Sequence, residues 1–178
     1  MRKTTFSIAA VILMLTLGAT AGWCADVAKI GTVNFQKIFD SSKAGQKVKN
    51  EIKEAGQRME ADLKQIGDEI SKIKEMLERD AGVMSKEARD EKKWQYDRKV
   101  DDVKALKRKY DRQIQELQMR LVNNVRKEVL NIIQDYGKKE GYLLIIEDLN
   151  TVYAPKSLDI TDQVIQLYNA AYEKKNKS

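Results

Sequence analysis

The feature that most constrains the fold is a charge-rich stretch with a helical apolar period, from about residue 42 to residue 136. Between Lys47 and Glu128 the chain has 22 positive and 18 negative residues, so nearly half of this stretch is charged. Apolar residues nevertheless recur at steps of three and four, which is typical of one face of a long helix. They form two consecutive seams: Ile52, Ala55, Met59, Leu63, Ile66, Ile70, Ile73 and Leu77, then Tyr96, Val100, Val103, Leu106, Tyr110, Ile114, Leu117, Leu121, Val125, Val129 and Ile132.

A short break separates the two seams. Gly82 can end the first helix, and Ser85 can cap the second, with Glu87 in its first turn. The sequence therefore predicts an antiparallel helical hairpin arm (coiled coil) over residues 42–137, with its tip near 80–85. At 1.5 Å per residue, such an arm reaches about 60 Å, far more than a globular domain of this mass.

Each seam contains a pair of consecutive four-residue steps that interrupts the regular pattern. These steps give an eleven-residue spacing from Ala55 to Ile66 and from Val103 to Ile114, and folding the hairpin at the tip brings the two stretches roughly level. The outgoing helix also contains Gly56 and Gly67, which are unfavourable in a helix interior. They are either tolerated exceptions or the sites at which the arm bends.

The two ends of the chain differ from the arm because they are poor in charge and rich in short apolar runs. We expect strands at residues 27–33, 142–146 and 151–154, a short helix at 35–39 capped by Asn34, and a final helix capped by Thr161. The fold class is thus α+β, with a small β-rich body formed by residues 26–41 and 138–178. These 57 residues make a marginal core, so we predict a homo-oligomer joined through the body. The residues expected in this oligomerisation body are Ile30, Val33, Leu144, Ile146, Val152 and Tyr153.

The N-terminal residues 1–25 have the pattern of a secretory signal peptide. Arg2 and Lys3 precede an apolar run over residues 6–17, and Ala19-Thr20-Ala21 is a small-x-small cleavage pattern, so we expect cleavage after residue 21 or nearby. The alternative is an N-terminal membrane anchor, for which the run is short. Removal lowers the count of Lys and Arg from 33 to 31 against 27 Asp and Glu, so the net charge falls from +6 to +4. The mature protein would work outside the cytoplasm, without ATP.

Composition narrows the possible chemistry. The chain has no His, and Cys24 is its single Cys, which removes histidine catalysis, His-based metal sites and Cys-x-x-Cys motifs. We predict no enzyme activity, no catalytic residue, no cofactor and no metal. The excess of basic residues also suggests nucleic-acid binding as a function, but the signal peptide and the interspersed acidic residues argue against it.

Short motifs at both ends of the chain are more specific than the arm pattern. They are residues 30–38 (IGTVNFQKI) with Ala44-Gly45, residues 140–146 (EGYLLII), Val152-Tyr153-Ala154, and residues 159–162 (DITD) with Val164-Ile165. These motifs resemble those of the Skp (OmpH-like) family of periplasmic chaperones, and the match covers nearly all of the mature chain. The resemblance implies a homotrimer with three helical arms around a cavity. It also implies an ATP-independent holdase for unfolded outer-membrane proteins in the periplasm.

Apolar residues outside the seams are candidate client contacts. Trp94 lies two positions before Tyr96, about 200° around the helix, and Met119 is placed in the same way between two seam residues. Met76 and Met84, near the tip, are further candidates. The alternatives for Trp94 are a contact between trimer subunits or simple exposure.

Four basic residues at the start of the second helix, Lys86, Arg89, Lys92 and Lys93, are candidates for contact with anionic lipid or lipopolysaccharide. The alternative is a solvated face, because acidic residues alternate with them. For the whole protein, the alternative function is an extracytoplasmic coiled-coil adaptor or structural protein that docks one dedicated folded partner.

Overall fold

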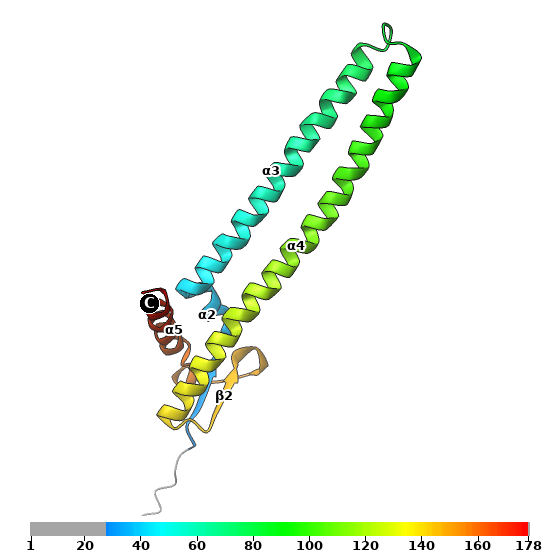
Figure 1. Ribbon diagram of the computed structural model, residues 1–178. Coiled ribbons are helices and arrows are strands. Elements are labelled where there is room, and N and C mark those ends of the chain that lie inside the picture. Colours follow the sequence, from blue (N-terminus) through cyan, green and yellow to red (C-terminus); the bar gives the residue numbers. More distant parts are fainter. Residues whose placement is uncertain (1–27, 178) are drawn as a thin grey trace, which may run out of the picture.

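The computed structural model describes residues 28–177 as a long helical hairpin that rises from a small body (Figure 1). Helices α3 (Lys43–Arg79) and α4 (Lys86–Glu140) run antiparallel and side by side. Each begins at a serine cap: the hydroxyl of Ser42 accepts the Gly45 N–H, and that of Ser85 accepts the Ala88 N–H. Helix α4 ends at Gly141, whose φ of 72° is in the left-handed region that glycine favours.

The seams predicted from the sequence form the contact between α3 and α4. All of their residues are buried or half-buried, and the exposed charged residues lie around them. Four seam residues are buried, namely Ala55, Ile73, Val125 and Val129. Because two helices cover a seam from one side only, most of it stays partly open to solvent along the arm.

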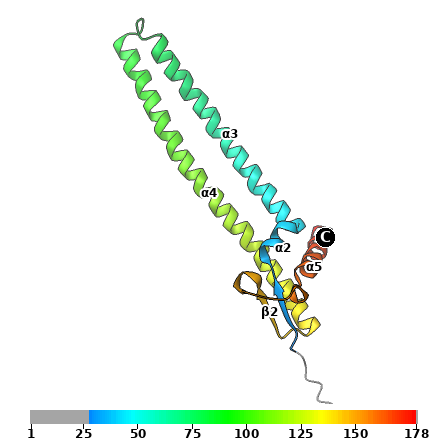
Figure 2. The same ribbon diagram turned by 180° about the vertical axis from the view of Figure 1, so that it is seen from behind.

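The body combines a small parallel sheet with three helical segments. Strand β1 (Ile30–Val33) pairs with β2 (Leu144–Glu147), and Ile30 lies opposite Leu144. Helices α2 (Phe35–Ser41) and α5 (Thr161–Lys177) and the last turns of α4 pack around this sheet (Figure 2). The fold class expected from the sequence, α+β with a helical hairpin arm, is therefore confirmed.

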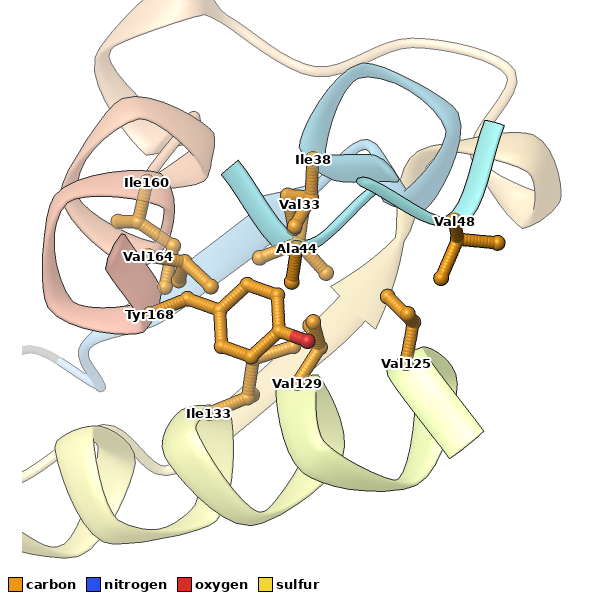
Figure 3. Close-up of a cluster of buried hydrophobic side chains, with 10 residues drawn as sticks. All are labelled: Val33, Ile38, Ala44, Val48, Val125, Val129, Ile133, Ile160, Val164 and Tyr168. Carbon is orange, nitrogen blue, oxygen red and sulfur yellow. The ribbon is translucent and has the colours of Figure 1, made fainter. Parts of the chain in front are cut away.

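The core sits where the arm meets the body. Figure 3 shows side chains of α2, α3, α4 and α5 converging on one cluster. Ile38, Val129 and Val164 are completely buried in it, and the Tyr168 hydroxyl donates to Glu128 Oε2 at 2.8 Å. The arm and body thus share one core, because α4 supplies the arm's second helix and one wall of the body.

The strand expected at residues 151–154 does not form. After β2 the chain turns through two short 3₁₀ segments, η1 (Asp148–Asn150) and η2 (Lys156–Leu158), with no regular structure between them. Both edges of β1 are occupied, one by β2 and the other by a bridge between Thr32 and Asp159, so the free edge of the sheet is the outer edge of β2. In the described structure η1 follows β2 directly, residues 151–154 do not pair with that edge, and Val152 and Tyr153 are exposed.

Two smaller expectations also need correction. Strand β1 begins at Ile30, because Ala28 and Lys29 are not in a strand, and Val27 lies outside the described residues. Thr161 is the first residue of α5 and not its cap: its N–H donates to Asp159 Oδ1, and its hydroxyl accepts the Asn34 N–H. Thr161 therefore links the start of α5 to the end of β1. The predicted signal peptide also lies outside the described residues.

Candidate functional site on the arm

Trp94 and Met119 lie on the face of α4 that points away from α3. Both side chains are 59% exposed, and at 100° per residue they lie about 20° apart around the helix and about 37 Å apart along it. The Arg98 guanidinium lies 5.1 Å from the centre of the Trp94 ring, within the range of a cation–π contact. Met76 and Met84 are half-buried near the tip, so the four candidate residues do not form one patch.

The four basic candidates near the tip do not lie together: two line a groove, and Lys86 and Lys92 lie outside it. Arg89 and Lys93 line a groove of about 390 Å³ whose floor includes Leu77 and Tyr96. Lys74 of α3 lines the same groove from the other side, a residue that sequence reasoning missed because it joins the group only through the pairing of the helices. Lys86 is exposed outside this groove.

Lys92 does not line the groove. It is half-buried, and its Nζ donates to Gln95 Oε1 at 3.4 Å. The structure therefore brings Arg89 and Lys93 together around an apolar floor and leaves Lys92 out.

Two polar contacts join the helices midway along the arm. Lys99 Nζ lies 2.8 Å from Glu69 Oε2, and the Tyr110 hydroxyl donates to Asp62 Oδ2 at 3.1 Å. The hydrogen bond from Lys99 keeps the pKa of Glu69 below its ordinary value, and the bond to Asp62 raises the pKa of Tyr110. These contacts fix the register of the two helices in this part of the arm.

Just towards the body from these contacts, the hairpin contains a groove of about 580 Å³ between α3 and α4. Its apolar lining is formed by Met59, Leu63, Tyr110 and Ile114, and Gly56 forms part of one wall. The sequence places these four residues in the seam and not on a surface, and the structure shows that they are only half-buried. The irregular seam steps were the signal in the sequence.

The predicted oligomerisation residues differ in their exposure. Val33 is buried in the chain's own core, and Ile146 is half-buried. Ile30 and Leu144, which lie opposite each other in the sheet, are partly exposed. Val152 and Tyr153 are exposed, and sequence reasoning missed further exposed apolar residues in the body, namely Leu143 and Leu149.

The described residues show neither a transmembrane helix nor a metal centre. None of the helices between residues 28 and 177 is long and apolar enough to cross a bilayer. In the same part of the chain, no three Asp, Glu or Cys side chains are grouped so that they could hold a metal ion.

A two-helix arm on a small α+β body, with a shared core at its root, defines the class of protein to which this chain belongs. Residues 29–168 match the family model for "Outer membrane protein (OmpH-like)", and the chain is a member of that family.

A solved structure of a candidate outer membrane chaperone (OmpH-like) from Caulobacter crescentus CB15 has a similar fold, with a TM-score of 0.77. The alignment covers 82% of this chain and 86% of that one at 15% sequence identity, so the likeness concerns the fold. Comparison with curated proteins finds no match.

Proposed function

We propose that this protein is an ATP-independent holdase chaperone of the periplasm, where it captures unfolded outer-membrane β-barrel proteins between helical arms and prevents their aggregation. The observation that carries the proposal is the half-covered seam of a highly charged arm, which offers apolar surface along its whole length. Family membership and the similar fold of a candidate outer membrane chaperone support it. The protein acts by binding and not by catalysis.

Capture combines weak apolar contacts with charge attraction. The arm has an excess of Lys and Arg, which attracts an acidic client over about 8 Å at physiological salt. Partly exposed seam residues and the exposed Trp94 then add non-directional contacts that are individually weak. Many weak contacts suit a client that has to leave without ATP.

We propose that the working form is a homotrimer joined through the body. The support is the group of exposed apolar residues before, in and after β2, because such a patch on a small body marks an interaction surface. This group comprises Leu143, Leu144, Leu149, Val152 and Tyr153. The N-terminal residues 1–25 would direct secretion and be removed.

The deciding experiment is suppression of aggregation. A denatured outer-membrane barrel is diluted into buffer with the mature protein and no nucleotide, and light scattering is followed while mass is measured by static scattering. We expect suppression at a stoichiometry of one client to three chains, which weakens between 50 mM and 500 mM salt. Capture that is insensitive to salt contradicts the electrostatic part. A protein that binds one folded partner and no unfolded barrel is an adaptor instead.

The groove near the tip supports contact with anionic lipid or lipopolysaccharide as a secondary property. Lys74, Arg89 and Lys93 place three positive charges around the apolar floor of the groove, against two negative charges from Glu78 and Asp97 in the same lining. We expect Arg89→Gln with Lys93→Gln to reduce binding to vesicles of anionic phospholipid. The matched control, Lys138→Gln with Lys139→Gln, removes the same charge from the other end of α4. Equal losses in both double variants indicate a non-specific effect of net charge on a solvated face.

A further inference from the structure

Irregular steps of both seams coincide with the mid-arm groove. Each helix has two consecutive four-residue steps here, Ala55–Met59–Leu63 on α3 and Leu106–Tyr110–Ile114 on α4. Helix α4 has a further run of such steps nearer the body, Leu117–Leu121–Val125–Val129. Eleven-residue spacing relaxes the left-handed supercoil, so side chains at such a step depart from regular knobs-into-holes packing. Because both irregularities lie at one level of the hairpin, their effects add, and the groove lies between them.

Gly56 keeps one wall of the groove open. A Cβ atom at this position would meet no atom within 4 Å, so no neighbouring group requires glycine there. Glycine in a helix interior costs about 1 kcal/mol relative to alanine. The effect of Gly56 on the structure is therefore to leave free volume beside Met59 and Leu63.

Several polar side chains of the groove lining are already bonded within the arm. The Tyr110 hydroxyl donates to Asp62 at 3.1 Å, and Lys107 Nζ lies 3.0 Å from Asp111 Oδ2. The remaining charged residue of the lining is Glu60, whose negative charge disfavours an anionic occupant. Hollows on α3 at residues 43–54 and 61–72, in contrast, are lined almost wholly by charged and amide side chains.

We propose that this mid-arm groove binds bulky apolar side chains, aromatic ones above all, of an extended unfolded polypeptide. Met59 offers a polarizable sulfur and Tyr110 a ring, both of which make favourable contacts with an inserted aromatic ring. The apolar lining and the acidic rim together select an uncharged side chain. The inference rests on the proposed function and names the part of the client that is held.

The occupant is an unfolded strand of a membrane barrel. Such strands alternate apolar and polar residues, and side chains two positions apart project from the same face about 6.6 Å apart. An extended strand can thus place its apolar face in the groove while its polar face meets water and the charged helix surfaces. The general charge attraction of the arm brings the client close, and the groove then distinguishes the apolar face from the polar one.

The test compares Gly56→Leu with Gly67→Leu. Both glycines lie inside α3 and both have open space at the Cβ position, but only Gly56 lines the groove. The probe is a fluorescent peptide with Phe and Tyr at alternate positions and Ser between them, measured by anisotropy. We expect Gly56→Leu to weaken binding about tenfold, which is about 1.4 kcal/mol, and Gly67→Leu to change it less than twofold. Unchanged or tighter binding by Gly56→Leu overturns the proposal.

A second measurement does not depend on filling the groove. A photoreactive phenylalanine analogue replaces Gln115, which lines the groove, or Gln118, which is exposed outside it. We expect cross-linking to the peptide at position 115 and little at 118, and equal yields overturn the proposal. If the protein still suppresses barrel aggregation while both tests of the groove fail, the groove assignment alone is wrong. Failure to suppress aggregation refutes the proposed function itself.

Discussion

The body, with the root of the arm, is packed much more closely than the rest of the arm. In the core that the body shares with the root, Ile38 and Val129 are completely buried, and a Cβ atom at Gly45 would lie 1.8 Å from the Phe39 carbonyl oxygen. Further along the arm, most seam residues are half-buried, and a Cβ atom at Gly56 or Gly67 would meet nothing within 4 Å. The shared core therefore accepts one geometry, whereas the arm beyond it leaves apolar surface uncovered.

Glycine substitutions give the sharpest contrast between the two regions. Gly45→Ala forces the crossing of α2 and α3 apart, because the atom it meets belongs to the backbone of Phe39 and not to a flexible side chain. We expect it to lower the free energy of unfolding by about 3 kcal/mol or more. Gly56→Ala should raise it by about 0.5–1 kcal/mol through helix propensity. Urea denaturation at one fixed protein concentration measures the free energy of unfolding of both variants. If the two substitutions change it in the same direction, the comparison is contradicted.

Truncation of a buried isoleucine gives the next largest difference. Ile38→Ala removes a completely buried side chain from the core at the root of the arm, and we expect a loss of about 2–5 kcal/mol. Ile66→Ala removes a half-buried seam residue whose site is already open to water, so the loss should be about 1 kcal/mol. Thermal unfolding followed by circular dichroism compares them. Equal losses would mean that a partner covers the arm as completely as the body covers Ile38.

The arm was predictable from sequence because its signals are local and repeated. The seam steps recur along both helices, and the caps at Ser42 and Ser85 need only the residues that follow them. The prediction of a strand at residues 151–154 was wrong, because the residue types indicate strand propensity only, whereas a strand also needs hydrogen bonds to the edge of a neighbouring strand.

The candidate sites were less predictable for the same reason. Lys74 lies beside Arg89 and Lys93 only in the folded hairpin, and the groove lining combines residues of both helices. Exposure of Trp94 and Met119, in contrast, followed from their angle to the seam within one helix. A sequence thus predicts which face of a helix is free more readily than what gathers between two helices.

The hydrogen bond between Tyr168 and Glu128 should make a smaller, pH-dependent contribution to the free energy of unfolding. Partial burial opposes ionisation of Glu128, but bonds from Lys175 and Tyr168 outweigh it and hold the pKa of this carboxyl below its ordinary value. A lowered pKa stabilises the folded state above the ordinary glutamate pKa, and this contribution is lost as the pH falls through the folded value. We expect Tyr168→Phe to cost about 1 kcal/mol at pH 7 and less at pH 3. If the loss of stability in Tyr168→Phe is the same at both pH values, the loss comes from packing and not from the charged acceptor.

The smallest effect on stability is expected for Trp94→Ala. The ring is largely exposed, and its one specific contact is the cation–π approach of Arg98, so the free energy of unfolding should change by less than about 0.5 kcal/mol. If the outer face of α4 contacts clients, the same variant should nevertheless weaken binding of an unfolded barrel several-fold in an anisotropy titration. Val83→Ala is the matched control, since Val83 is an exposed apolar residue in the tip turn. A large loss of stability with unaltered binding would place Trp94 in a contact between subunits, and the arm would then resemble the body at this point.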